Sequence, residues 1–175
     1  MIYVKDIIDK FNGKLLCGDI NLVLDNFSHD TRTIQKGDIY VGINGEAFDG
    51  NKFYKDALEK GAKACILDNI DVNDIPLEYK DRTIVLVEDS LKCIQDLARY
   101  KRSLYDIPVV GVTGSVGKTS TKDMIYSVLS TKYKVLKTEG NNNNHIGLPF
   151  TILRLKDEDI MVIEMGMNNF GEISF

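Results

Sequence analysis

The sequence predicts an α/β fold built from two domains, and three observations support this prediction. Short apolar segments typical of strands alternate with helical segments, which is the pattern of sheets with crossover helices. A glycine-rich loop directly follows one of the apolar strands and opens a helix at residue 118. A polar stretch at 101–107 interrupts the pattern, so we expect one domain over residues 1–104 and a second over residues 105–175.

The composition is that of a globular protein without a nucleic-acid or membrane partner. Apolar residues make up 43% and charged residues 27% of the 175 residues. The net charge of −4, with no cluster of Lys or Arg, argues against binding to nucleic acid or to an anionic membrane. No apolar stretch reaches the roughly 18 residues of a membrane span, and the charged N-terminus does not resemble a signal peptide. We therefore expect a cytoplasmic protein.

The cysteines do not form a pattern that binds a metal or builds a disulfide framework. Cys17, Cys65 and Cys93 are odd in number and contain no C-x-x-C pair. This favours small buried side chains in a reducing compartment.

In the first domain, helix and strand signals follow one another in order. Apolar residues from Val4 to Phe11 recur at helical spacing, and Gly13 is placed to end that helix. A second helix is expected over Lys52–Lys60 with Gly61 as its stop, and a third begins at Asp89 or Ser90. Strands are expected at 38–43, 64–67 and 83–87, with a loop at 68–82.

In the second domain, strands and helices alternate strictly. The expected order is strand 108–112, glycine loop, helix 118–131, strand 133–137, an Asn-rich loop, helix 145–154 and strand 160–165. A nucleotide-binding α/β domain usually needs more than the roughly 70 residues present here. We therefore expect a truncated parallel-sheet domain, and the chain to be an N-terminal fragment.

The glycine loop has the features of a phosphate-binding loop. Composition predicts that residues 108–112 form a buried strand, which runs into Thr113-Gly-Ser-Val-Gly117 and then into a helix that opens with Lys118, Thr119 and Ser120. Glycines allow the backbone N–H groups to converge on an anion, and the helix N-terminus adds partial positive charge. Lys118 can reach the phosphates and Thr119 can ligate Mg²⁺. The first glycine of the usual motif is replaced by Val112, and a glycine turn with a surface lysine is the alternative interpretation.

Glu164 is the predicted carboxylate partner of this loop. It ends the apolar strand 160–163, and ligands of such sheets bind at the carboxyl ends of the strands. It can hold Mg²⁺ directly or through water. An ordinary acidic residue at a strand end is the alternative.

Four consecutive asparagines, Asn141 to Asn144, follow the strand at 133–137. One of them would suffice to cap the next helix, which is the simpler interpretation. Because asparagine both donates and accepts hydrogen bonds, a loop that contacts a ligand is the other.

Three motifs together resemble the Mur ligase family. They are T-G-S-x-G-K-T-S in the glycine loop, T-x-G-N-x-N-N-x-I-G-x-P in the Asn-rich segment, and V-I-E-M-G-M-N-N-x-G-E-I near the C-terminus. In the first domain, Ser28 to Arg32, Lys36 to Gly45 and Phe48 to Asn51 are similar to the uridine-nucleotide-binding domain of the family. The resemblance covers the whole chain, in order. It departs from some relatives at His29 and Asn169.

The resemblance implies a small α/β N-terminal substrate domain followed by a truncated P-loop-type parallel-sheet domain that binds ATP. The implied enzyme is an ATP-dependent amide ligase of peptidoglycan precursor synthesis that uses Mg²⁺. It joins D-alanyl-D-alanine to UDP-N-acetylmuramoyl-tripeptide through an acyl phosphate. The family has a third, closing domain that this chain lacks, so we expect the 175 residues alone to be inactive.

The resemblance also implies roles for individual residues. Lys118 and Glu164 are the expected catalytic residues, and Thr119 and Glu164 the expected metal ligands. Arg32 suits a phosphate, with a surface salt bridge to Asp30 as the alternative. Asn142, Asn144 and His145 are expected to line the substrate groove between the domains, and Asn168 and Asn169 to help orient the substrate. The residues expected to bind the nucleotide are Thr113, Gly114, Ser115, Val116, Gly117, Lys118, Thr119 and Ser120, and those expected to bind substrate are Ser28, Asp30, Thr31, Arg32, Asn44, Asp49, Asn142, Asn144 and His145.

Other functions remain open at this point. A related Mur ligase that adds the third amino acid fits less well, because its loop usually reads T-G-T-N-G-K-T and it lacks the asparagine run. A P-loop kinase or transport ATPase leaves the first domain without a role. A nucleotide-binding fragment without turnover is a further alternative, and the oligomeric state is left open.

Overall fold

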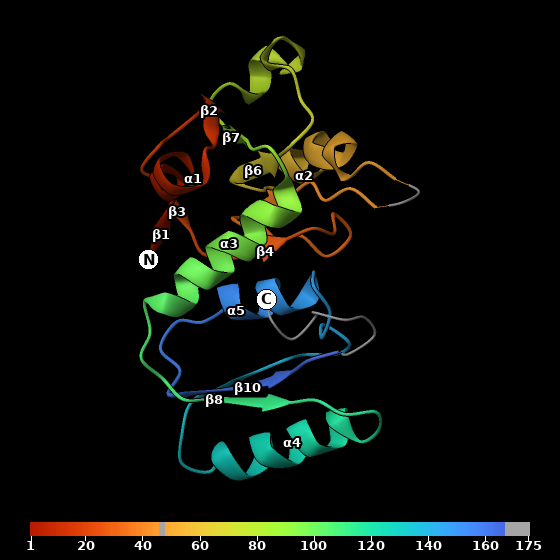
Figure 1. Ribbon diagram of the computed structural model, residues 1–175. Coiled ribbons are helices and arrows are strands. Elements are labelled where there is room, and N and C mark those ends of the chain that lie inside the picture. Colours follow the sequence, from red (N-terminus) through yellow and green to blue (C-terminus); the bar gives the residue numbers. More distant parts are fainter. Residues whose placement is uncertain (46–47, 167–175) are drawn as a thin grey trace. The chain divides into compact units, whose positions relative to one another are not determined.

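The computed structural model describes residues 1–45 and 48–166, and its chain divides into two compact units. Unit 1 comprises Met1–Leu97 and unit 2 comprises Ala98–Phe175. Both combine helices with parallel strands, as the sequence predicts (Figure 1). The helix α3 (Ser90–Ser103) runs across the division between them.

Unit 1 is organised around a five-stranded sheet with the order β2-β7-β6-β5-β4. Four neighbouring strands are parallel and β2 joins them antiparallel. A separate two-stranded ribbon pairs β1 with β3. The strands are β1 (Ile2–Tyr3), β2 (Lys14–Cys17), β3 (Val23–Leu24), β4 (Phe27–Ser28), β5 (Ile39–Val41), β6 (Ala64–Leu67) and β7 (Thr83–Leu86).

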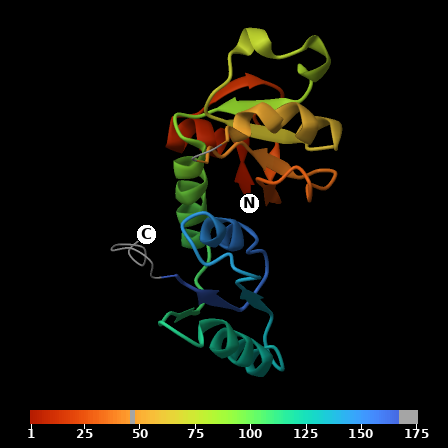
Figure 2. The ribbon, with the colours of Figure 1, turned by 90° about the vertical axis from the view of Figure 1, so that its right-hand side faces the viewer.

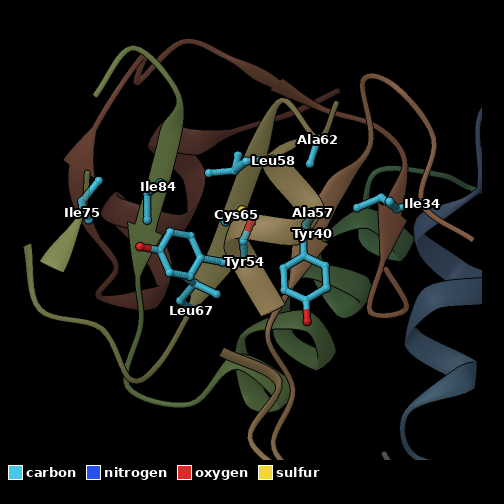
Figure 3. Close-up of a cluster of buried hydrophobic side chains, with 10 residues drawn as sticks. All are labelled: Ile34, Tyr40, Tyr54, Ala57, Leu58, Ala62, Cys65, Leu67, Ile75 and Ile84. Carbon is cyan, nitrogen blue, oxygen red and sulfur yellow. Dashed lines mark hydrogen bonds between the residues drawn. The ribbon is translucent and has the colours of Figure 1, made fainter. Parts of the chain in front are cut away.

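Both faces of the central strands are buried because their side chains alternate. Tyr40 and Leu67 point into a core cluster that α2 (Tyr54–Glu59) closes with Ala57 and Leu58 (Figure 3). Ile39, Val41 and Ile66, at the alternate positions, are also fully buried and face the other way. Near-continuous apolar strands of this kind are typical of parallel sheets covered on both sides.

The helices of unit 1 begin and end close to the predicted residues. The first helix, α1 (Val4–Phe11), ends one residue earlier than predicted, because Asn12 and not Gly13 adopts the left-handed conformation, with φ of 54°. The second begins as a 3-10 turn, η1 (Gly50–Phe53), and continues as α2 up to Gly61, whose φ of 99° confirms it as the stop. Asp89 caps α3, since its Oδ1 accepts the Lys92 N–H at 2.8 Å. The predicted loop at 68–82 contains two 3-10 turns, η2 (Val72–Asp74) and η3 (Leu77–Tyr79).

Unit 2 contains a three-stranded parallel sheet with the order β8-β10-β9. Its strands are β8 (Val109–Val112), β9 (Val135–Lys137) and β10 (Ile160–Glu164). The crossover helices α4 (Lys118–Leu129) and α5 (Gly147–Leu153) lie on opposite faces of this sheet (Figure 1 and Figure 2). Every element predicted for this region is present at nearly the predicted bounds.

One prediction for unit 2 is wrong. Residues 108–112 read as a buried strand, but β8 lies at the edge of the three described strands and Val109 is 45% exposed. The most buried strand is β10, which has a neighbour on each side and is buried from Met161 to Glu164. Apolar composition alone does not distinguish a central strand from an edge strand.

Candidate phosphate-binding site

The three strands of unit 2 bring their carboxyl ends to one edge of the sheet. The glycine loop follows β8, Thr138 follows β9, and Glu164 is the last residue of β10. In open parallel sheets this edge is where ligands bind. The predicted loop and the predicted carboxylate therefore meet, because β8 and β10 are parallel neighbours and Glu164 is paired with Val112, the residue before the loop.

The backbone of the glycine loop has the form expected of a phosphate cradle. Gly114 and Gly117 have φ of 144° and 79°, values that residues with a side chain rarely adopt. Gly117 stands directly before the first residue of α4, so the N–H groups of the first helical turn face the loop without helical partners. Such a helix start attracts anions.

Lys118 lies at the start of α4 and folds back over the loop. Its Nζ donates to the carbonyl oxygen of Gly114 at 2.7 Å. The ammonium group is thus held above the turn that we expect to bind the phosphates of ATP. Val116, at the tip of the loop, is 92% exposed, so its part in a cradle would come from its backbone alone.

Glu164 is buried, and its side chain is held by partners from α4 and from the asparagine segment. Thr119 Oγ1 donates to its Oε1 at 3.3 Å, and Asn143 Nδ2 donates to the same oxygen at 2.8 Å. The ammonium of Lys122 lies 3.4 Å from Oε2, close enough to pair electrostatically without forming a regular hydrogen bond. Only 2% of Glu164 is exposed to solvent.

These partners set the charge state of Glu164. Burial by itself raises the pKa of this carboxyl, but the hydrogen bonds from Asn143 and Thr119 and the charge of Lys122 outweigh it. The resulting pKa lies below the usual value of a glutamate, so the group is ionised at neutral pH. A buried carboxylate that stays ionised is suited to hold a cation.

The backbone around Glu164 is fixed by its neighbours along the sheet edge. The buried Thr138 side chain accepts the Glu164 N–H at 3.0 Å, and the Thr138 N–H donates to Val162. Asn143 contributes twice, since its carbonyl oxygen also accepts the Gly166 N–H at 2.7 Å. The carboxylate is therefore positioned before any ligand arrives.

The oxygens of Thr119 and Glu164 fit a shared magnesium ion. Two ligands at right angles in a magnesium shell of about 2.0–2.1 Å radius are about 2.9 Å apart. The observed 3.3 Å between Thr119 Oγ1 and Glu164 Oε1 is close to that separation. No group of three or more His, Cys, Asp or Glu side chains able to bind a metal occurs among residues 1–45 and 48–166. Any metal here would thus depend on few protein ligands, as is usual for Mg²⁺ bound with nucleotides.

The residues of the asparagine run have different contacts. Asn144 caps α5, because its Oδ1 accepts the N–H groups of Ile146 and Gly147, which is the simpler of the two interpretations. Asn143 contacts Glu164, while Asn142 and His145 are exposed. Asn142 also explains Gly147, since a Cβ at that glycine would come within 2.5 Å of the Asn142 Cα. Asn168 and Asn169 lie outside the described residues.

A second candidate site lies in unit 1. Residues 29–32 line a cavity of about 400 Å³ there, together with Tyr40, Phe48 and Phe53. Three of the predicted substrate residues, Asp30, Thr31 and Arg32, come together there. Phe48 and Phe53 are 59% and 46% exposed. Exposed aromatic rings beside a guanidinium suit a ligand that has both a flat base and phosphates.

The guanidinium of Arg32 pairs with Asp30 in this structure. Nη2 of Arg32 lies 2.6 Å from Oδ2 of Asp30, and the Arg32 side chain is 86% exposed. Hydrogen bonding from Arg32 lowers the pKa of Asp30 to about 2. Ser28 orders the same turn by accepting the Asp30 N–H at 3.2 Å. The surface salt bridge is thus present, and the phosphate-binding role of Arg32 stays a prediction.

Asn44 and Asp49, also predicted to bind substrate, take part in an internal network instead of lining the cavity. Both accept hydrogen bonds from Nδ2 of the buried Asn51, at 3.1 and 2.9 Å. Asn51 Nδ2 also donates to Asp68 at 2.7 Å, and its Oδ1 accepts the Asp68 N–H at 2.9 Å. Their contacts here order the loop at 44–51, and their predicted role toward substrate stays untested.

Four residues that the sequence analysis did not single out matter at these sites: Lys122, Thr138, Asn143 and Asn51. Asn143 lies inside the asparagine run, and the sequence alone does not show which of these asparagines contacts Glu164. Lys122 had a signal in the sequence, because a lysine at a helix position facing a sheet is unusual.

The cysteines are free, and burial raises the pKa of the Cys65 and Cys93 thiols, the latter to about 12. Cys17 is only half-buried.

Comparison with known proteins identifies the family. The model of the "Mur ligase family, catalytic domain" matches residues 24–102, and that of the "Mur ligase middle domain" matches residues 112–175. The chain belongs to the Mur ligase family. The two matched segments correspond to the candidate sites in unit 1 and unit 2 respectively.

Named relatives narrow the comparison within the family. The chain is 40% identical over 172 residues to the UDP-N-acetylmuramoyl-tripeptide–D-alanyl-D-alanine ligase of Bacillus subtilis, covering 97% of this chain and 37% of that protein. It is 38% identical over 175 residues to the ligase of the same name from Escherichia coli, again covering 37% of the relative. The chain therefore spans little more than a third of the length of these curated relatives.

Solved structures agree with these relatives. MurF ligase from Thermotoga maritima in complex with ADP has a TM-score of 0.71 and 41% sequence identity, covering 85% of this chain and 34% of that one. MurF from Acinetobacter baumannii has a TM-score of 0.83 at 29% identity, covering 98% of this chain and 37% of that one. The predicted Mur ligase fold is confirmed.

No helix among the described residues has the length and apolar character that crossing a bilayer requires.

Proposed function

We propose that the chain is the N-terminal part of an ATP-dependent ligase that joins D-alanyl-D-alanine to UDP-N-acetylmuramoyl-tripeptide. The observation that carries this proposal is the meeting of the glycine loop, Lys118, Thr119 and the ionised Glu164 at one sheet edge. It is supported by identity of about 40% to ligases of that name over nearly the whole chain. The chain covers about 37% of those proteins, so the complete activity extends beyond these residues.

The loop residues have distinct roles in this proposal. Residues 113–120 hold the phosphates of ATP, chiefly through backbone N–H groups, as helix N-termini do. The Lys118 ammonium leaves the Gly114 carbonyl and neutralises the charge that develops on the transferred phosphoryl group. Phosphoryl transfer to the substrate carboxylate gives an acyl phosphate and ADP, and the amine of the dipeptide then displaces phosphate. Positioning and charge neutralisation are the main requirements of the first step.

Thr119 and Glu164 are the residues that would hold Mg²⁺. The separation of their oxygens and the ionised state of Glu164 fit this ion. When bound, Mg²⁺ would supply positive charge that offsets the negative charge of the phosphates. Asn143 and Thr138 keep the carboxylate aimed at Thr119 throughout.

The cavity in unit 1 is our proposed site for the uridine diphosphate part of the substrate. Arg32 would exchange its bond to Asp30 for a phosphate, because its planar fork can pair with either anion. Phe48 or Phe53 would stack on the uracil ring. Thr31 adds a hydroxyl group, while Asn142, Asn144 and His145 remain our candidates for contacts to the peptide part. We also propose that residues 1–104 and 105–175 are the two functional domains, and that the protein acts in the cytoplasm.

The test is an assay of ADP release by the full-length gene product that contains these residues. We expect release that requires both the tripeptide nucleotide and D-alanyl-D-alanine, and a product whose mass equals that of the pentapeptide nucleotide. Absence of dipeptide-dependent release would contradict the proposal. The 175-residue chain alone is expected to show weak or no turnover.

A Mur ligase that adds the third amino acid is the second candidate. A UDP-N-acetylmuramoyl-L-alanyl-D-glutamate–2,6-diaminopimelate ligase from Clostridium tetani is 34% identical over 146 residues, covering 82% of this chain. Replacing the substrates in the same assay with the dipeptide nucleotide and diaminopimelate distinguishes the two, and we expect no release with that pair.

A further inference from the structure

The buried lysine of α4 is unexplained by the phosphate loop alone. Lys122 is the only residue of the twelve in α4 that is fully buried, with 2% exposure. The inward face of a crossover helix normally presents apolar side chains to its sheet. Burying an ammonium group is costly unless a charge partner compensates it. Its partner is Glu164, the carboxylate that we propose as a metal ligand.

The two oxygens of Glu164 face different neighbours. Oε1 is the oxygen shared with Thr119 and Asn143, on the side of the phosphate loop. Oε2 is enclosed, receives no regular hydrogen bond, and lies 3.4 Å from Lys122 Nζ. The other carboxylate near Lys122 is Asp123, at 3.9 Å, which is half-exposed and is bound by Lys137 at 2.8 Å. The charge of Lys122 therefore acts mainly on Oε2 of Glu164.

Cations differ in how they use a carboxylate. Mg²⁺ is small and usually keeps several waters, with one or two carboxylates among its ligands. Ca²⁺ takes six to eight ligands and often binds both oxygens of one carboxylate. A cation that needs both oxygens of Glu164 would have to approach Oε2 against the ammonium group of Lys122.

We infer that Lys122 is a positioning residue whose ammonium group keeps Oε2 of Glu164 from binding a cation. The site therefore accepts Mg²⁺ through Oε1 and disfavours Ca²⁺. The inference rests on the proposed metal role of Glu164. It assigns to the buried lysine a task in the choice of metal ion, beyond balancing the charge of a carboxylate.

The test measures ADP binding by calorimetry in the full-length gene product, with Mg²⁺ or with Ca²⁺ present. We expect tighter ADP binding with Mg²⁺ in the unaltered protein. In K122M, Oε2 becomes available, and the ratio of the two affinities should move toward Ca²⁺ on the order of tenfold, the usual size of effects from outer-shell partners. K122R keeps the positive charge and should largely preserve the ratio.

Lys137→Met is the matched control. It removes one positive charge from the same unit and breaks the pair with Asp123, but it does not touch Glu164. We expect the ratio of the unaltered protein. An unchanged ratio in K122M, or an equal change in K137M, would overturn the inference. If ADP binding in the unaltered protein does not depend on any divalent ion, the metal role of Glu164 fails, and the inference fails with it.

A structural measurement covers the case in which K122M does not fold. In crystals of the unaltered protein with Mg²⁺ and ADP, we expect Lys122 to remain at Oε2 and only Oε1 to face the metal, directly or through water. A carboxylate that binds the metal with both oxygens, or a displaced Lys122, would refute the inference.

Discussion

The two candidate sites of this chain differ in how firmly the protein holds them without ligand. In unit 2, Glu164 is 2% exposed and its partners come from α4, the asparagine segment and the sheet edge. In unit 1, the Arg32 side chain is 86% exposed and pairs with Asp30, two residues away. The difference shows that the proposed phosphate site is organised without ligand, whereas Arg32 is ordered only locally. Substitutions should therefore affect chemistry and stability in unit 2, and ligand binding alone at Arg32.

The largest effect is expected from Lys118→Ala. Loss of the ammonium group above the loop removes charge neutralisation in the transition state. The rate of dipeptide-dependent ADP release should fall on the order of 10²–10³-fold, as for the loss of other preorganised donors. Lys132→Ala, a lysine that lies over the Tyr133 ring, is the control and should leave the rate unchanged. Equal rates of ADP release for K118A and the unaltered protein would show that the loop takes no part in the reaction.

The next effect concerns stability and uses Glu164→Gln. The amide keeps the shape of the side chain but removes the buried charge partner of Lys122, which is then left with only the half-exposed Asp123 at 3.9 Å. Breaking a buried ion pair in this way costs about 3–5 kcal/mol of unfolding free energy, which urea unfolding can measure. Asp30→Asn makes the corresponding change in the exposed pair and should leave the urea midpoint unchanged. Similar shifts in both variants would contradict the contrast between the two sites.

The same pair gives a pH dependence with a definite sign. The folded pKa of Glu164 lies below its usual value, so the pair contributes stability above about pH 4.5, the ordinary pKa of the group. That contribution is lost as the pH falls through the lowered folded value. Acid unfolding of the unaltered protein should therefore show a stability loss below pH 4.5 that is smaller in E164Q. Parallel acid curves for the two proteins would contradict this assignment.

A smaller loss of stability is expected from Asn51→Ala in unit 1. The change leaves the Asp68 N–H and the oxygens of Asn44 and Asp49 without this partner. Each lost hydrogen bond contributes about 0.5–1.5 kcal/mol, and the loss should appear as a lower urea midpoint. Asn73→Ala, in an exposed 3-10 turn, is the matched control. If both changes have the same small effect, the network does not stabilise the loop at 44–51.

The smallest effect is local to the exposed pair. The pKa of Asp30, held at about 2 by Arg32, should rise toward the ordinary 3.8 in Arg32→Ala. A titration of the Asp30 carboxyl carbon by NMR measures this shift. Stability should hardly change, because an exposed pair contributes little. A titration midpoint that stays near 2 in R32A would show that another group lowers the pKa.

Much of unit 2 could be predicted because its signals are local in sequence. The glycine loop places its glycines, lysine and hydroxyl within a few residues, and the first two strands of the region are each followed by a helix. The contacts of Glu164 were missed because they join distant residues, as with Asn143, 21 positions away. The edge position of β8 was also missed, since strand order depends on crossovers that apolar composition does not report.

Unit 1 was harder to predict for a related physical reason. The strands β1, β3 and β4 have two residues each, too short to show any periodicity. Asn44 and Asp49 have the right chemistry to contact a ligand, yet in this structure they are bound by Asn51. Polar residues in a loop look the same in sequence whether they bind a ligand or each other.

The most direct test of the account is a calorimetric titration of the full-length gene product with ADP and, separately, with UDP-N-acetylmuramoyl-tripeptide. The two proposed sites lie in different units, with Lys118 at one site and Arg32 at the other. We predict that K118A loses ADP binding and keeps binding of the tripeptide nucleotide, while R32A does the reverse. Loss of both ligands in either variant, or of neither in both, would contradict it.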